Sequence, residues 1–253
     1  MKLLTCDIGN SKIKSGLFSN SELIELNNFG SAEEFIVYAK KLNITDIAIS
    51  SVVPSSVQKI KSALEDHFKI FVIDKNSSFN LKLNYDSLDT LGIDRICSCE
   101  GAFYLFRNSS EFQNYDEGTF LLTIDFGTAT TINFIKYPGE FIGGIIFPGI
   151  KLMSSALNSN TAQLPLVEIS DYKNLIGRTT RQSIASGILH STLSLINETI
   201  VYLRKELNAE KIFVFITGGN ADSIKPFLQF DFINEKGLVL YGIKAVYEKN
   251  MKN

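Results

Sequence analysis

Two nearly identical segments constrain the fold of this chain more than any other feature of its sequence. LLTCDIGN occupies residues 3–10 and LLTIDFGT occupies residues 121–128, one near the start of each half. Each is an apolar run that ends in Asp-x-Gly and is followed by a second strand-like run, which predicts a β-hairpin. A single Asp-x-Gly is usually no more than a turn, but two copies in matching contexts indicate a duplicated α/β unit.

The chemistry of these hairpins suits phosphate. Glycine allows a tight turn and lets backbone N–H groups approach a ligand closely, and such groups bind phosphate oxygens. Asn10, Ser11, Thr128 and Thr130 add side-chain donors nearby. An aspartate at the end of a strand can hold a metal ion that neutralises phosphate charge. Two hairpins, one from each half, could therefore bind one polyphosphate between them.

Other nucleotide-binding motifs are missing from the sequence. There is no G-x-x-x-x-G-K-[ST] loop, and no G-x-G-x-x-G connects a first strand to a helix. A third element does fit a nucleotide, because the glycine pair Gly218–Gly219 in TGGNAD would let the backbone pass close to a flat ring such as adenine.

The charge balance excludes several classes of partner. Lys and Arg number 25 against 27 Asp and Glu, which leaves no basic surface for nucleic acid or anionic lipid. The chain has an odd number of cysteines, Cys6, Cys97 and Cys99, which indicates buried thiols in a reducing compartment. His67 and His190 lie in no metal-type motif, so we expect no zinc site. The longest apolar run, FIGGIIFPGI, is too short to span a membrane, and we expect a cytoplasmic protein.

Hydrophobic periodicity predicts mostly alternating strands and helices, the order of an α/β protein. Strand patterns occupy 3–6, 12–18, 44–50, 69–74, 119–125, 130–136, 141–147 and a segment from 211. Helical patterns follow the capping box formed by Ser31 and Glu34, and occupy 54–68, 91–106 and 177–207. We expect a polar loop at 76–90 and a tight structural turn at GGIIFPG.

Seven short blocks then occur in the order typical of type III pantothenate kinases, a family in the acetate and sugar kinase, heat-shock and actin superfamily of duplicated ATPases. They are DIGNSKIK, LGIDR, DFGTATTI, GGIIFPG, Leu164–Pro165, GRTTRQSIASG and TGGNAD. The resemblance implies a duplicated ribonuclease-H-like (actin-like ATPase) fold of class α/β. It implies two related domains, residues 1–115 and 116–253, with a nucleotide cleft between them.

The same resemblance implies an activity and its partners. A protein of this family transfers the γ-phosphoryl group of ATP to the primary hydroxyl of pantothenate, the first step of coenzyme A biosynthesis. The reaction is expected to need Mg²⁺ with ATP and a monovalent cation, K⁺ or NH₄⁺. The family also implies a homodimer with the substrate site near its interface, and neither nucleic acid nor a membrane as a partner.

Site residues follow from the resemblance position by position. The first phosphate loop corresponds to Asp7, Ile8, Gly9, Asn10, Ser11, Lys12, Ile13 and Lys14, and Asp7 could also hold Mg²⁺. Thr128 corresponds to a further ATP contact and Asp125 to a ligand of the monovalent cation. The pantothenate contacts correspond to Tyr85, Gly92, Ile93, Asp94, Arg95 and Thr180, with Asp94 as the catalytic base. Ser11 stands where the family usually has Thr, which keeps the hydroxyl.

Physical reasoning agrees with these roles and leaves alternatives open. Phosphoryl transfer depends on positioning and on charge neutralisation more than on covalent help. Asp94, in the first turn of its helix, is favoured in its charged form, so it either accepts the proton or mainly orients the hydroxyl. Arg95 suits a carboxylate. Alternatively, Asp94 and Arg95 are a helix charge and a surface arginine, Tyr85 anchors a loop, and Lys14 is a solvated strand residue.

Two other functions compete with this interpretation. One is a kinase of the same superfamily that acts on another small acceptor, which would explain the hairpins but not LGIDR or GRTT. The other is a non-catalytic regulatory homologue of the same fold. Loss of the aspartates at positions 7, 94 and 125 would favour the homologue, and all three are present.

Overall fold

The computed structural model describes residues 2–109, 115–169 and 174–251. It contains two compact units, each described below by itself. The first unit comprises Met1–Asn114, Gly139–Ile142 and Gly237–Asn253, and the second comprises Tyr115–Pro138 and Gly143–Lys236. The first unit therefore combines residues from both ends of the chain. These units are defined by contacts between residues, whereas the predicted domains were defined by the repeated segments of the sequence. The domains 1–115 and 116–253 therefore stay a prediction.

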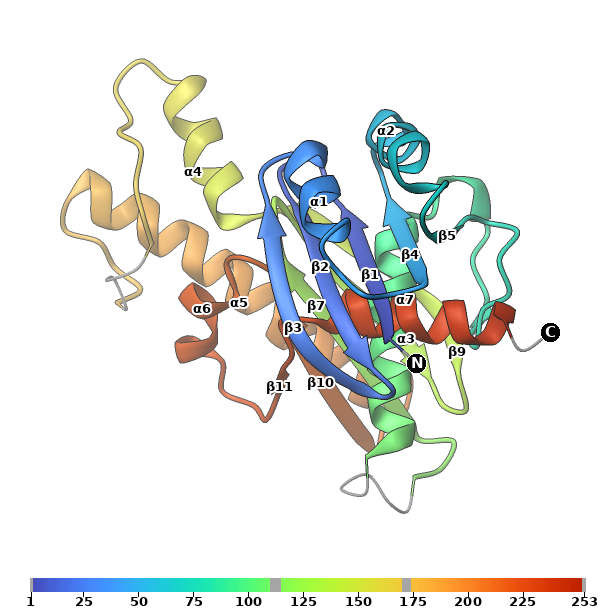
Figure 1. Ribbon diagram of the computed structural model, residues 1–253. Coiled ribbons are helices and arrows are strands. Elements are labelled where there is room, and N and C mark those ends of the chain that lie inside the picture. Colours follow the sequence, from blue (N-terminus) through green and yellow to red (C-terminus); the bar gives the residue numbers. More distant parts are fainter. Residues whose placement is uncertain (1, 110–114, 170–173, 252–253) are drawn as a thin grey trace. The chain divides into compact units, whose positions relative to one another are not determined.

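The first unit is built on a five-stranded sheet in the order β3-β2-β1-β4-β5 (Figure 1). β1 runs antiparallel to β2 and parallel to β4, and β4 runs parallel to β5. The strands are β1 Lys2–Ile8, β2 Ile13–Ser19, β3 Glu22–Phe29, β4 Asp46–Ser51 and β5 Lys69–Val72.

Helices cover both faces of this sheet. α1 (Ala32–Ala39) and α2 (Pro54–Leu64) pack on the face that receives Leu4, Cys6 and Ile8 of β1. α3 (Ile93–Asn108) and α7 (Leu238–Met251) contribute to the core on the opposite face, which receives Leu3. This division follows from the two-residue period of a strand, which sends successive side chains to opposite faces.

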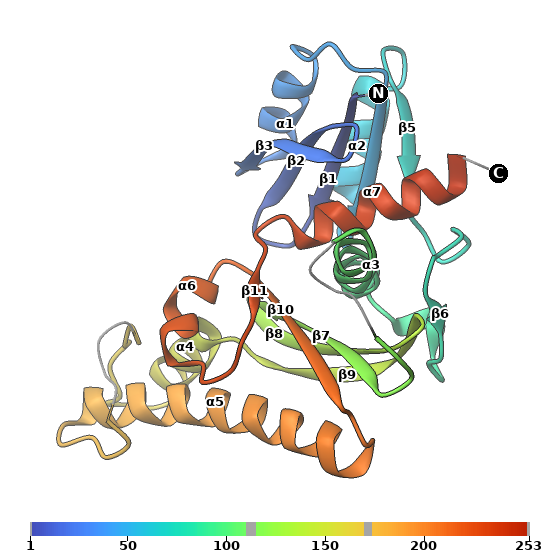
Figure 2. The ribbon, with the colours of Figure 1, turned by 90° about the horizontal axis from the view of Figure 1, so that it is seen from below.

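α3 and α7 cross at unusually close range (Figure 2). Glycine occupies both sides of the crossing, because a Cβ on Gly101 would overlap the carbonyl of Leu238 and one on Gly242 would overlap the carbonyl of Cys97. The backbones of the two helices therefore touch where a side chain would separate them.

A short segment completes the first unit. β6 (Lys82–Leu83) runs parallel to the start of β9 (Glu140–Pro148), with Lys82 opposite Glu140 and Leu83 opposite Phe141. A 3₁₀ turn, η1 (Leu88–Thr90), follows and leads into α3. The expected loop at 76–90 thus contains a strand pair that ties it to residues 139–142.

The second unit repeats the strand arrangement of the first. Its strands follow the order β11-β10-β7-β8-β9 within a six-stranded sheet whose last strand is β6, and β7 runs antiparallel to β8 and parallel to β10. This order matches β5-β4-β1-β2-β3 strand for strand, so the duplication predicted from the repeated segments is confirmed. The strands not yet bounded are β7 Thr119–Phe126, β8 Ala129–Lys136, β10 Lys211–Thr217 and β11 Ile233–Asn234.

The second unit contains the longest helix within the described residues. α5 (Thr180–Glu206) begins at the N-cap Thr179, whose hydroxyl accepts a hydrogen bond from Gln182 N at 3.2 Å. α4 (Ile150–Ser159) packs beside it, and a short α6 (Ala221–Ile224) with η2 (Lys225–Phe227) follows β10. Within the ranges given above, no helix is both long and apolar enough to cross a bilayer.

Several predicted elements need correction. β3 was not predicted, because half-buried and exposed residues mix along it without clear alternation. α4 was not predicted either, and GGIIFPG is the end of β9 followed by the N-cap of α4 instead of a tight turn. The helix expected at 54–68 ends at Leu64. The other predicted strands and helices lie within a few residues of their expected places, whereas β11 and α7 (Leu238–Met251) had no predicted bounds.

Candidate active site

The first phosphate loop is the tip of the β1–β2 hairpin. Asp7 pairs with Lys14 and Ile8 with Ile13, and Gly9 N donates to Lys12 O at 3.1 Å to close the turn. The buried side chains of Ile8 and Ile13 anchor the hairpin in the core. Asn10, Ser11 and Lys12 are exposed at the tip, and the side chains of Asp7 and Lys14 are half-buried.

The start of α3 lies close to this hairpin. Burial raises the pKa of the Cys97 thiol well above its ordinary value, and the charges of Asp7, Glu100 and Asp94 raise it further. Cys97 and Ile93 of α3 also pack in one core cluster with Leu3 of β1, so the helix that carries Asp94 packs on the strand that carries Asp7. Asp94 also folds back over Gly92, the N-cap of the helix, because a Cβ on Gly92 would overlap its Oδ1. Two carboxylates from separate predicted motifs thus lie in one region.

Arg95 lies beside a pair of aromatic rings. Its Cζ is 5.8 Å from the ring centroid of Tyr85 and 5.8 Å from that of Phe141, and the two rings are 5.8 Å apart. The residue is only 6% exposed, so the alternative of a surface arginine is wrong. Phe141 is fully buried. No local signal in the sequence links Phe141 to LGIDR, because the β6–β9 pairing alone brings them together.

The second hairpin has its own supports. Asp125 pairs with Thr131 on β8 and with Thr217 on β10. Asn220 holds the turn from the side, since its Nδ2 donates to Gly127 O at 3.0 Å and its backbone N donates to Phe126 O at 2.9 Å. Sequence reasoning placed TGGNAD near adenine and missed this role of Asn220.

Glycines pack against the same hairpin. Gly149 N donates to Thr128 O at 2.9 Å, and a Cβ on Gly149 would overlap the loop backbone. Gly218 has φ +98° and lies against the carboxylate of Asp125, where a Cβ would overlap Oδ1. Only glycine combines that backbone conformation with this contact.

Thr180 is the first residue of α5 and is exposed. It lines an apolar groove of about 940 Å³ between α4 and α5. The other lining residues are Pro148, Leu152, Met153, Ala156, Leu157, Asn160, Leu164, Ser183, Ile184, Gly187, Ile188 and Ser191.

The donor chemistry fits the expected cations. Mg²⁺ is commonly bound by one or two carboxylates together with substrate phosphates and water, and Asp7 beside an exposed glycine loop supplies such a carboxylate. This arrangement needs no cluster of three protein ligands, and the residues described above contain none. For a monovalent cation, the carboxylate of Asp125 is an oxygen donor at the second hairpin, and the backbone of Gly218 packs directly against it.

The predicted site residues fall into two sets. Asp7–Lys14, Tyr85 and Gly92–Arg95 belong to the first unit, in which Arg95 at the start of α3 lies beside the ring of Tyr85. Asp125, Thr128 and Thr180 belong to the second unit, in which Asp125 and Thr128 share one hairpin and Thr180 begins a separate helix.

Comparison with known protein sequences identifies a family that this chain resembles. Residues 3–201 match the model of the type III pantothenate kinase family. A type III pantothenate kinase from Legionella pneumophila (strain Corby) is 32% identical over 264 residues, which cover 98% of this chain and 99% of the relative.

Solved structures extend the comparison to the fold. A structure from Campylobacter jejuni, described as a candidate Baf family transcriptional activator, has a TM-score of 0.61 at 20% identity and covers 99% of this chain and all of the other. An archaeal actin homologue has a TM-score of 0.50 at 13% identity and covers 98% of this chain and all of the other. At such identities the likeness concerns the fold alone, and the predicted actin-like fold is confirmed. The family match and the curated relative carry the further conclusion that this chain belongs to the type III pantothenate kinase family.

Proposed function

We propose that this chain carries out the reaction of its family with the residues named above. It is an ATP-dependent kinase that phosphorylates the primary hydroxyl of pantothenate, a step of coenzyme A biosynthesis. The observation that carries the assignment of residues is the packing of Cys97 and Ile93 of α3 in one core cluster with Leu3 of β1. It brings the strand that leads into the first phosphate loop and the start of the LGIDR helix together in the first unit.

Asp7–Lys14 bind ATP in this proposal, with backbone N–H groups and the side chains of Asn10, Ser11 and Lys12 directed at phosphate oxygens. Thr128 contributes a further ATP contact from the second hairpin. ATP is used with a divalent metal, for which Asp7 is the nearest fitting ligand of the first hairpin, and the metal neutralises phosphate charge when it is bound. Asp125 holds K⁺ or NH₄⁺.

Pantothenate is bound by residues around the start of α3. Asp94 accepts a hydrogen bond from the primary hydroxyl, orients that oxygen towards the γ-phosphate and takes its proton. Arg95 binds the carboxylate of pantothenate with its planar guanidinium, and Tyr85 holds that guanidinium in place from one side. Gly92 and Ile93 shape the backbone of the site, and Thr180 adds a hydroxyl.

A homodimer is the second part of the proposal. Most exposed large apolar side chains of the described residues lie between positions 146 and 207 of the second unit, among them Leu152, Leu157 and Tyr202. Contiguous exposed apolar surface of this kind is typical of a protein interface. Another copy of the chain would cover the α4–α5 groove, and Thr180 on its edge would lie near the interface.

The cytoplasm is the expected compartment for this reaction. Cys6, Cys97 and Cys99 are all free and buried, which suits reducing conditions.

The test is an ADP-release assay with pantothenate, ATP and Mg²⁺, in K⁺ buffer and in Na⁺ buffer. Wild-type protein is expected to turn over mainly in K⁺. Asp94→Asn is expected to lower kcat by about 10²-fold or more, because general acid–base and positioning contributions are of that size, with little change in ATP affinity. Asp125→Asn should abolish the difference between the two buffers.

Two outcomes would count against the proposal. If Asp94→Asn kept wild-type kcat, Asp94 would not act on the hydroxyl. If the folded wild-type protein bound ATP but gave no pantothenate-dependent turnover in either buffer, a regulatory homologue or another acceptor would be the better description.

A further inference from the structure

Glu100 is a fully buried carboxylate on α3, six residues after Asp94. Its Oε1 accepts a hydrogen bond from the backbone N of Leu81 at 2.9 Å, and its Oε2 accepts one from Asn80 Nδ2 at 2.8 Å. Burial raises the pKa of Glu100, although these hydrogen bonds act in the opposite direction. Since a buried carboxylate is costly unless its oxygens are satisfied, this group has a specific partner: the segment that begins at Asn80.

That segment leads directly to the aromatic partner of Arg95. After Leu81 the chain forms β6, where Lys82 N donates to Gly139 O and Asn84 N donates to Phe141 O, both at 2.9 Å. The next residue is Tyr85, whose ring packs on Phe141 and faces Arg95. Helix α3 thus holds both ends of residues 80–85, through Glu100 at one end and Arg95 at the other.

We propose that Glu100 is a positioning residue of the pantothenate site, which fixes residues 80–85 against α3 and so holds Tyr85 against Arg95. The proposal rests on the substrate contacts assigned above to Tyr85 and Arg95. Two donors converge on Glu100, so a carboxylate can accept from both, whereas an amide would direct its own N–H group at one of them.

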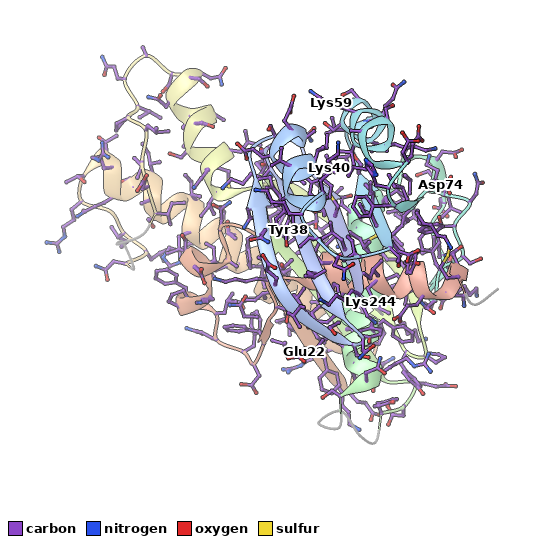
Figure 3. All side chains as sticks on the ribbon, in the orientation of Figure 1. Glu22, Tyr38, Lys40, Lys59, Asp74 and Lys244 are labelled. Carbon is purple, nitrogen blue, oxygen red and sulfur yellow. The ribbon has the colours of Figure 1, made fainter. Side chains whose placement is uncertain are left out.

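Other charged side chains near Glu100 either pair with one another or line a neighbouring cavity. A cavity of about 450 Å³ beside it is lined by Asn80, Arg107, Glu248 and Lys249, among others. Lys249 favours the charged form of Glu100. Lys244, labelled in Figure 3, is buried and donates to Glu248 Oε1 at 2.6 Å and to Tyr104 Oη at 3.1 Å. The Glu100 oxygens themselves accept hydrogen bonds from Asn80 and Leu81.

The experiment compares Glu100→Gln with the double variant Asn80→Asp/Glu100→Gln. In the single variant, the new amide N–H group faces Asn80 Nδ2, and the pair re-forms only if the Asn80 amide turns over and gives up its contact of 3.5 Å with Ala245 O, so the anchor is weakened. In the double variant, the new carboxylate at position 80 accepts from the new amide, so the contact is restored with its roles exchanged. Tyr104→Phe is the matched control, because it removes a hydrogen bond from the same helix without touching residues 80–85.

We expect Glu100→Gln to raise the KM for pantothenate about tenfold, the size of effect expected for loss of a hydrogen bond to a charged group. The KM for ATP should stay within about twofold, because residues 80–85 contact Glu100, Phe141 and Arg95, none of which is assigned to ATP. The double variant should recover most of the pantothenate KM, and Tyr104→Phe should keep it. A purely structural role would instead lower thermal stability without this selectivity.

Tyr85→Ala distinguishes failure of the inference from failure of the proposed site. A raised pantothenate KM in Tyr85→Ala with an unchanged one in Glu100→Gln would overturn the positioning role and leave the site intact. An unchanged KM in Tyr85→Ala would overturn both. Equal changes in the two KM values of Glu100→Gln, or no recovery in the double variant, would also overturn the positioning role.

Discussion

The guanidinium of Arg95 lies beside two aromatic rings that also contact each other, and all three separations are 5.8 Å. A planar guanidinium can pack on aromatic rings while its in-plane N–H groups bind a carboxylate bidentately. The ring pair therefore restricts the orientation in which Arg95 presents its donors. A lysine at this position would keep the charge and lose that orientation.

Arg95→Lys should consequently behave as a severe substitution. We expect kcat/KM for pantothenate to fall by about tenfold or more, from the lost stacking and the lost bidentate contact. Steady-state kinetics with varied pantothenate would measure it. Arg107→Lys is the control, because Arg107 also lies over a ring, that of Phe103 at 5.5 Å, but is exposed. Equal effects of the two substitutions would contradict the role given to Arg95.

Glu100 also gives the stability of the protein a pH dependence. Its pKa in the folded chain is raised from the ordinary value of 4.5, mainly by burial. The folded state therefore binds the proton more tightly than the unfolded state, and this contribution to stability is present below pH 4.5 and lost as pH rises through the folded pKa.

Urea unfolding of wild-type protein and of Glu100→Gln from pH 4 upwards would measure this dependence. The free energy of unfolding of the wild type, relative to that of the variant, should decrease as the pH rises from about 4.5. A constant difference across this range would show that burial does not raise the pKa of Glu100. The comparison cancels the other titrating groups, because both proteins carry them.

At the scale of elements, the crossing of α3 and α7 is the tightest contact of the first unit. Gly101 and Gly242 allow the two backbones to touch, and α7 also packs on β1, which carries Asp7. The crossing therefore supports the strand and the helix from which Asp7 and Asp94 project. Its geometry depends on the absence of two side chains.

Gly242→Ala should destabilise the protein although alanine favours helices. The added Cβ would overlap the carbonyl of Cys97, and overpacking of this kind costs about 1–3 kcal/mol. Gly30→Ala is the control, since the added Cβ would meet only the Glu34 carboxylate at an ordinary contact distance of 3.6 Å, and the free energy of unfolding should change by no more than about 0.5 kcal/mol. Urea unfolding measures both changes. If both substitutions lowered the free energy of unfolding by the same amount, close packing at the α3–α7 crossing would not explain the effect of Gly242→Ala.

The elements that could be predicted were those with local signals. Ser31 Oγ accepts a hydrogen bond from Glu34 N at 3.3 Å, and Glu34 Oε2 accepts one from the backbone N of Gly30 at 2.8 Å, much as the predicted capping box suggests. Both hairpins carry Asp-x-Gly. β3 has no comparable signal, because it lies at an edge of its sheet and exposes part of both faces. α4 follows β9 after a single glycine, and its apolar residues line an open groove instead of a closed core.

At the scale of the whole molecule, the two sheets repeat one strand order, which the repeated segments predicted. The candidate site was predictable where it follows hairpins and the first turn of α3. Phe141, Asn220 and Glu100 were not, because each acts through a contact between segments distant in the sequence. Such contacts depend on the register of strands and on helix packing, which a single sequence does not reveal.

The proposed dimer gives a prediction at this scale. Leu152→Glu introduces a charge into the α4–α5 groove at a side chain that is 43% exposed, so the single chain should still fold. We expect this variant to sediment as a monomer while the wild type sediments as a dimer, because an unpaired charge is costly at a buried interface. Val37→Glu, on α1 and 55% exposed, is the matched control and should stay dimeric. A dimeric Leu152→Glu variant would exclude this groove as the interface.

The return of α7 to the first unit has a consequence for the nascent chain. A ribosome makes residues 1–114 early, but the helix that packs on α3 and β1 emerges only after the whole second unit has been made. Domains generally fold as units during synthesis, and here the unit that starts first is completed last. Until α7 arrives, the apolar side chains of Leu3, Phe18 and Cys97 lack a cover, and chaperones would find their binding surface there.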